Sequence, residues 1–169
     1  KKSVYAQPMQ IFQWGKNNRF GSMERAFASE YLAVPHVGRA LWTLDANRDH
    51  QTDFAVTHQT EPAALLINRN HAPGKWIELE LIGTVSARDA IGAKVVIQSD
   101  RDRWVTAVTA GDGYLCSNER ILRFGLGDTR GHCDITVTWP NRVEQTWTGL
   151  APQQCWLLAQ DEPEAFEKR

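Results

Sequence analysis

Cysteine is scarce in this sequence of 169 residues, which contains only Cys116, Cys133 and Cys155. No two of them have the CxxC spacing of a zinc motif, so the spacing argues against a zinc site. The odd number allows one disulfide with one free thiol, but buried free thiols on strands are the favoured interpretation. The five histidines are scattered too, and no two are spaced as ligands on one helix face.

Long apolar runs and an excess of charge are also missing. No stretch reaches the roughly 18 apolar residues that a membrane helix needs, so we expect no membrane span. The formal net charge of −1 argues against a dedicated nucleic-acid surface. The sequence begins with Lys1-Lys2-Ser3, without an initiating methionine or a signal peptide, so we expect a piece of a longer protein.

An acidic stretch at residues 45–53 is the clearest motif. Asp45, Asn47 and Asp49 alternate in a tight loop, and Asp53 follows at the start of the next apolar segment. Ca²⁺ takes several oxygen ligands at roughly 2.3–2.6 Å, and short acidic side chains on a curled loop supply them. Carboxylates packed this closely repel each other, and a divalent ion removes that penalty. The loop therefore predicts a calcium site with these four side chains as ligands.

The same stretch has an interpretation without metal. Turns rich in Asp and Asn are common between strands, because these side chains bond to their own backbone. The sixth position of such loops usually carries glycine, which adopts a positive φ freely, and here it is His50. The neighbouring segments 40–44 and 54–56 are apolar and extended, so the loop joins two strands and is not an EF-hand.

Short strands dominate the prediction for residues 1–71. They are expected at residues 9–14, 37–44, 53–58 and 63–67, with a hairpin turn at 15–18. Met23, Phe27 and Tyr31 have helical spacing, which predicts a short helix or turn over 23–32. Residues 7–12 also align with residues 61–66 at an offset of 61 − 7 = 54. A period near fifty, built of four short strands, is typical of a β-propeller blade.

Residues 71–74 are the best candidate for a domain boundary, because a run of short strands follows. These strands are predicted at residues 76–81, 93–98, 104–109, 121–124, 135–139, 143–147 and 155–158. Seven strands with turn signals between them indicate an antiparallel β-sandwich or barrel over residues 72–160. The charged tail 161–169 is expected to fray.

These segments together resemble a known family arrangement. The motifs are residues 88–93 (RDAIGA), 111–115 (GDGYL), 124–127 (FGLG) and 139–140 (WP). In this order and spacing, residues 75–160 resemble the ASPIC/UnbV domain, and residues 36–70 resemble the FG-GAP/VCBS blade that precedes it. The resemblance implies an all-β fold, a calcium-binding acidic loop, an extracellular or periplasmic location, and no established catalytic activity.

Two other loops are candidate ligand-binding sites. Arg88 and Asp89 are able to meet a sugar or a carboxylate, although an Arg–Asp pair that fixes a turn is the favoured interpretation. Tyr114, which follows Gly111-Asp112-Gly113, is able to stack on a ligand ring, although two glycines around an aspartate more often only build a turn or bulge. The seven tryptophans allow a sugar-stacking platform, but alternation on strands more often buries them.

Catalysis is not predicted. The sequence has no GxSxG motif and no recognisable Cys–His arrangement, and carboxylates on one short loop cannot flank a substrate as a glycosidase requires. The first hypothesis is a non-catalytic extracellular binding or adhesion module, with a glycan or an extracellular protein as partner. The alternatives are a carbohydrate-binding accessory domain of a larger secreted enzyme and a purely structural cap of a propeller.

Overall fold

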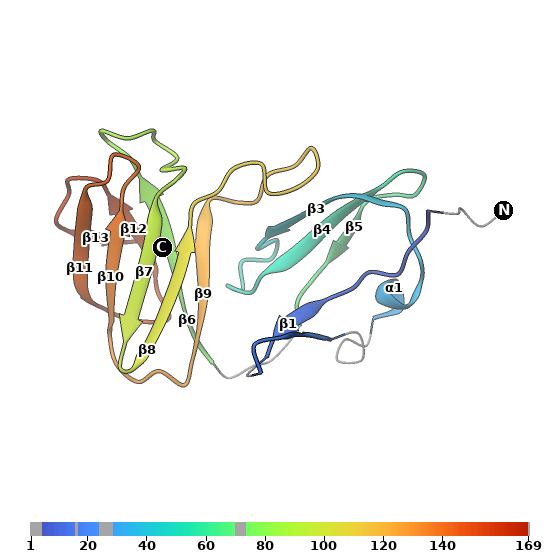
Figure 1. Cartoon of the computed structure of the whole chain (residues 1–169), viewed down its shortest axis with the longest axis horizontal. Coiled ribbons are helices and arrows are strands. Elements are labelled where there is room, and N and C mark those ends of the chain that lie inside the picture. The colour runs from blue at the N-terminus through green and yellow to red at the C-terminus, as the bar shows by residue number, and fades with distance from the viewer. Residues whose placement is uncertain (1–4, 16, 24–28, 70–73, 169) are drawn as a thin grey trace.

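The computed structural model describes residues 5–15, 17–23, 29–69 and 74–168. This part of the chain is almost entirely β, as the sequence predicts. Figure 1 shows two β bodies, with strands β1 to β5 on one side and β6 to β13 on the other. No helix in the described residues is both long and apolar enough to cross a membrane.

The smaller body contains a hairpin and a three-stranded sheet. In the hairpin, β1 (Phe12–Trp14) pairs with β2 (Phe20–Ser22). In the sheet, the central strand is β4 (Asp53–His58), and it pairs with β3 (Gly38–Leu44) and β5 (Ala64–Leu66). The described residues therefore do not show the four-stranded propeller blade that the sequence repeat suggests, because β1 pairs with β2 whereas β5 pairs with β4.

The helix predicted over 23–32 is described only at its two ends. Only α1 (Glu30–Ala33) is observed of the helix expected over 23–32, and residues 24–28 of that segment lie outside the described residues. Residues 71–73 of the predicted domain boundary also lie outside them.

The larger body is a sandwich of two four-stranded sheets. One sheet has the order β13 (Ala165–Glu167), β12 (Cys155–Ala159), β6 (Lys75–Ile82), β9 (Ile121–Gly127). The other has the order β11 (Glu144–Leu150), β10 (Cys133–Thr138), β7 (Lys94–Ser99), β8 (Asp102–Ala107). Buried residues from both sheets join in one hydrophobic cluster, which makes this body a sandwich and not a closed barrel.

Two features of the sandwich differ from the prediction. The β6–β12 pair is parallel, so the sheets are not purely antiparallel. The tail expected to fray contains β13, which pairs with β12, and Lys168 at its end forms an ion pair with Glu80. The preceding strand β12 and the distant residue Glu80 thus stabilise a tail whose local composition alone favours fraying.

The loop after β8 contacts the smaller body along the free edge of β3. The Cys116 thiol donates to the Leu41 carbonyl at 3.3 Å, and the Thr43 amide donates to Asn118 Oδ1 at 2.8 Å. Because β3 is the edge strand of its sheet, these bonds use backbone groups that no strand in its own sheet pairs. In Figure 1 this loop reaches from the sandwich toward the smaller sheet.

Candidate functional site

The outer face of β6 carries a row of polar side chains. The side chains of β6 alternate between the two faces, and those in the core are Ile77, Leu79 and Leu81. Glu78 lies on the opposite face, where the register places Cys155 of β12 on one side and Arg123 of β9 on the other. Three adjacent strands thus bring a carboxylate, a thiol and a guanidinium together.

Glu78 is the centre of this row, and both of its oxygens have partners. Arg123 Nε donates to Oε1 at 2.7 Å, and the Cys155 thiol donates to Oε2 at 3.0 Å. Only 5% of the residue is exposed. Burial alone would raise the pKa of Glu78, but the Cys155 hydrogen bond and the charge of Arg123 outweigh it and lower that pKa. Glu78 is therefore ionised at neutral pH.

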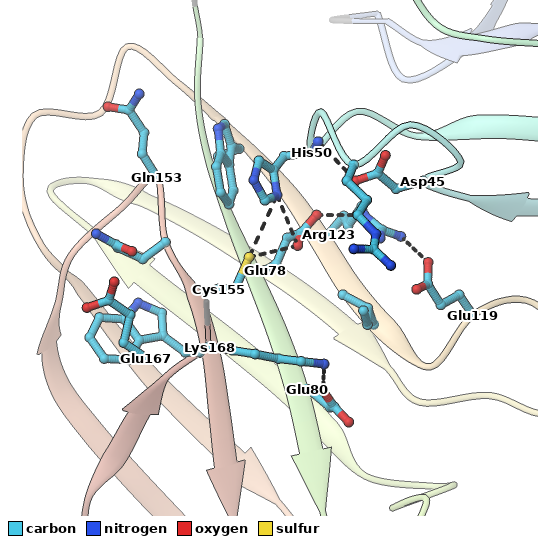
Figure 2. Close-up of a pocket in the computed structure, with 15 residues that line it drawn as sticks. Asp45, His50, Glu78, Glu80, Glu119, Arg123, Gln153, Cys155, Glu167 and Lys168 are labelled. Atoms are coloured by element: carbon cyan, nitrogen blue, oxygen red, sulfur yellow. Dashed lines mark hydrogen bonds and ion pairs between the residues drawn. The ribbon is translucent and has the colours of Figure 1, made fainter.

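His50 of the acidic loop covers this row from the smaller body (Figure 2). Its Nδ1 lies 3.4 Å from Glu78 Oε2 and 3.7 Å from Cys155 Sγ. The imidazole stacks on the Trp76 indole, with 4.1 Å between ring centroids and an interplanar angle of 16°. His50 has a φ of 65°, which is the conformation expected at the sixth position of the loop. The backbone bend at His50 thus presents its ring to β6.

A Cys–His arrangement is therefore present, although no motif in the sequence indicated one. Burial raises the pKa of the Cys155 thiol to about 12, and the Glu78 carboxylate beside it acts in the same direction. Since the thiolate is the nucleophilic form, a thiol that stays protonated is a poor nucleophile at neutral pH. The geometry resembles a catalytic pair, but the electrostatics do not activate it.

An open cavity of about 700 Å³ lies beside these groups. The acidic loop contributes Asp45, Arg48 and His50 to its lining, and the rest comes from β6, β9, β12, β13 and residues next to these strands. Lys168 and Glu80 form an ion pair at its rim. The cavity thus has side chains of both charges and lies where the two bodies meet.

The acidic loop itself is held by bonds between carboxylates and backbone amides. Asp45 accepts from the amides of Asp49 at 3.1 Å and His50 at 3.0 Å. Asp53 is fully buried and accepts from the amides of Ala46 at 2.8 Å and Asn68 at 2.7 Å. These are the bonds that the interpretation without metal expects, and each carboxylate oxygen retains a second lone pair.

The oxygen donors of the loop fit a hard cation chemically. Asn47 Nδ2 and the Gln51 amide donate to Asp49, and these bonds lower the pKa of Asp49, so it remains ionised. Asp45, Asn47 and Asp49 lie on one curl near the surface, whereas the buried Asp53 closes it. In the described residues, two groups of three His, Cys or acidic side chains bring one donor atom from each within 4.8 Å of one another. Neither group contains Asp45, Asp49 or Asp53.

One of these groups is His50–Glu78–Cys155, and the other is His36–His58–Glu61. In the second group, both ring nitrogens of His58 are already bonded, Nδ1 to the Pro62 carbonyl at 2.7 Å and Nε2 to the Tyr31 hydroxyl at 2.6 Å. His36 Nδ1 bonds to Glu61 at 2.6 Å. This second cluster is a saturated hydrogen-bond network.

The other predicted ligand-binding residues lie away from the cavity. Arg88 and Asp89 are exposed on the loop after β6, and no ion pair joins them in the described part of the chain. The Ala90 amide donates to the Ala87 carbonyl at 2.8 Å, so Arg88 and Asp89 are the central residues of a turn. Tyr114 is 66% exposed and belongs to the lining of a separate hollow beside β3. The structure does not bring these three residues together.

The tryptophans and cysteines are dispersed as well. Trp139 and Trp147 are in the core, and Trp156 is partly buried against it, so these three do not form an exposed platform for sugars. All three cysteines are free thiols. Cys133 is buried on β10, as the favoured interpretation expects, whereas Cys116 lies on the loop after β8 and Cys155 is only partly buried.

The residues that sequence reasoning missed are Glu78, Arg123 and Cys155. The alternation in β6 marks Glu78 as facing outward, which is the only local signal. Its partners lie 45 and 77 residues further along the chain, so no spacing rule links them to it.

Comparison with known proteins gives a family match within the sandwich. Residues 83–165 match the family described as ASPIC and UnbV, and the matched segment contains strands β7 to β12 of the sandwich. In addition, 101 residues are 27% identical to cartilage acidic protein 1 of Xenopus tropicalis. That stretch is 57% of this chain but only 15% of the relative, so the chain spans a small part of the relative's length.

Proposed function

We propose that this chain is a non-catalytic extracellular binding module whose ligand surface is the cavity between the acidic loop and the outer face of β6. The observation that carries this proposal is the composition of the cavity of about 700 Å³, which has Arg48 and Lys168 beside Asp45 and Glu80. Mixed charges on an open surface suit a polar partner, either a glycan or an extracellular protein. The similarity to an acidic protein named for cartilage supports the extracellular location.

The acidic loop supports this surface. We propose that Asp45, Asn47 and Asp49 hold a calcium ion and that the buried Asp53 fixes the curl from which they project. A bound ion would neutralise the repulsion between the carboxylates and favour the folded loop by mass action. Because His50 extends from the same loop to β6, a stiffer loop would hold the wall of the cavity in place.

The proposal of a module without catalytic activity is supported by the pKa values of the two groups best placed for catalysis. The Cys155 thiol has a pKa raised to about 12 by burial, so it is not an activated nucleophile. Glu78 has a lowered pKa, so it is not a general acid at neutral pH. This pair therefore supplies neither a thiolate nor a carboxylic acid proton at neutral pH.

A binding panel tests the proposal. The chain is presented to a glycan array and to surfaces of collagen, fibronectin and laminin, in calcium and in EDTA. We expect a calcium-dependent response to at least one probe, and a loss of that response in Arg48→Glu and Lys168→Glu. The exposed Arg88→Glu variant, outside the cavity, is the matched control. A calcium-independent melting temperature together with no response to any probe would overturn the proposal.

A second function is favoured by one observation, the cover over the edge of β3. Cys116 and Asn118 bond to the backbone of this strand, and the Glu119 amide donates to the Thr43 carbonyl at 3.5 Å. The ASPIC/UnbV domain would then also act as a cap that protects an edge strand from pairing with other chains. Increased aggregation of an Asn118→Ala variant, measured by light scattering, tests this role.

A further inference from the structure

We propose that His50, Glu78 and Cys155 form a binding site for one zinc-like cation, a divalent ion that takes thiolate, imidazole and carboxylate ligands together. The three residues come from the acidic loop, β6 and β12. This site is separate from the oxygen donors proposed for calcium, because it uses a sulfur and a nitrogen, which calcium does not favour. It therefore does not depend on the proposed function.

The distances between the three donor atoms lie within a few tenths of an ångström of those around a tetrahedral ion. Glu78 Oε2 lies 3.0 Å from Cys155 Sγ and 3.4 Å from His50 Nδ1, and the sulfur and nitrogen are 3.7 Å apart. Zinc bonds of about 2.3 Å to sulfur and about 2.0–2.2 Å to nitrogen and oxygen, at tetrahedral angles, place ligand atoms roughly 3.3–3.6 Å apart. Only small side-chain movements would be needed to admit the ion.

The surrounding groups orient the carboxylate for this role. Arg123 Nε holds Oε1 at 2.7 Å, so Oε2 is the oxygen left facing the thiol and the imidazole. Arg123 is in turn paired with Glu119 Oε2 at 2.9 Å, which offsets its positive charge near the ion. Partners that fix the orientation of a ligand in this way are typical of protein metal sites.

The protons also balance. When the ion binds, the Cys155 S–H bond breaks, a metal–sulfur bond forms, and the proton leaves to solvent. No oxidant or reductant is involved. His50 binds through Nδ1 with its proton on Nε2, which is an ordinary tautomer of neutral imidazole.

The fourth position of the ion faces the cavity. The His50 side chain is 39% exposed, so solvent reaches this side of the cluster. A water molecule would complete the tetrahedron there. The bound ion would link the acidic loop to two strands of the sandwich and thereby join the two bodies.

Cobalt substitution of the whole chain tests the site. The EDTA-treated protein is titrated with Co²⁺, and we expect one equivalent to produce the near-ultraviolet charge-transfer band of a cobalt–thiolate bond. Cys155→Ser should abolish the band, while the hydroxyl keeps a hydrogen bond to Glu78. Cys116→Ser is the matched control, since that thiol is outside the cluster, and it should keep the band.

A second variant distinguishes the loss of a metal ligand from a folding defect. His50→Gly removes the imidazole at a φ of 65° that glycine adopts freely, and we expect it to weaken Zn²⁺ binding at least about tenfold in calorimetry. Circular dichroism checks that each variant is folded. No band in the unmodified chain, or an equal band in Cys155→Ser, would overturn the site. A calcium response that fails while the cobalt band remains would refute only the calcium proposal.

Discussion

Glu78 and Cys155 are register partners in the parallel pair of β6 and β12, and the thiol donates to the carboxylate across 3.0 Å. This relationship places a hydrogen-bond donor beside a carboxylate that is 5% exposed. Together with Arg123 on the other side, it allows a charged residue to be buried on the outer face of the sheet.

Replacing Glu78 should destabilise the sandwich. Glu78→Gln removes the charge that pairs with Arg123, and we expect the free energy of unfolding in urea to fall by about 1–3 kcal/mol, less than for a fully buried pair because Glu119 also pairs with Arg123. Glu80→Gln is the control, because the Glu80–Lys168 pair is exposed and should contribute less than about 1 kcal/mol. Equal losses in both variants would contradict the role given to Glu78.

Cys155 should make stability sensitive to alkaline pH. The pKa of its thiol is about 12 in the folded protein, against 9.0 for an unperturbed cysteine thiol. Its contribution to the free energy of unfolding is therefore fully present below pH 9.0 and is lost as the pH rises toward 12. Cys155→Ser does not titrate there, so the fall in its free energy of unfolding between these limits should be shallower. Parallel curves for the two proteins would exclude this contribution.

Asp49→Asn should remove the calcium response and leave the calcium-free loop nearly unchanged. The amide still accepts from the Gln51 backbone, which preserves the turn, but one carboxylate charge is lost. The measurement is the shift in melting temperature on adding calcium. Asp89→Asn, on an exposed loop outside the acidic stretch, should respond as the unmodified chain does, and a full response in Asp49→Asn would remove Asp49 from the ligands.

Gly113 permits the close contact between the loop after β8 and β3. An added Cβ would lie 2.5 Å from Cys116 Sγ and 3.2 Å from the Leu41 carbonyl oxygen. We expect Gly113→Ala to lower the free energy of unfolding by about 1–3 kcal/mol, through overpacking at this contact. Gly125→Ala, where nothing lies within 4 Å, should cost less than about 1 kcal/mol. No difference between the two would argue against a tight junction.

Local sequence predicted much of the fold. The prediction of a strand at 53–58 is confirmed by β4, and the strand predicted at 76–81 is confirmed by β6 (Lys75–Ile82). Predictions from the alternation of apolar and polar residues were right because the backbone of a strand fixes its side-chain period at two residues. The four-stranded blade is not shown, and the prediction of a fraying tail was wrong because β13 depends on pairing with β12.

Strands such as β4 and β6, the core face of β6 and the acidic curl with its bend at His50 follow from the order of the residues alone, because each depends on neighbours in the chain. The meeting of His50 and Cys155 at Glu78, across 105 residues, became visible only in the folded chain. It depends on the parallel pairing of β6 with β12 and on the placement of the loop over β6. Both arise from packing between distant segments, which no local periodicity encodes.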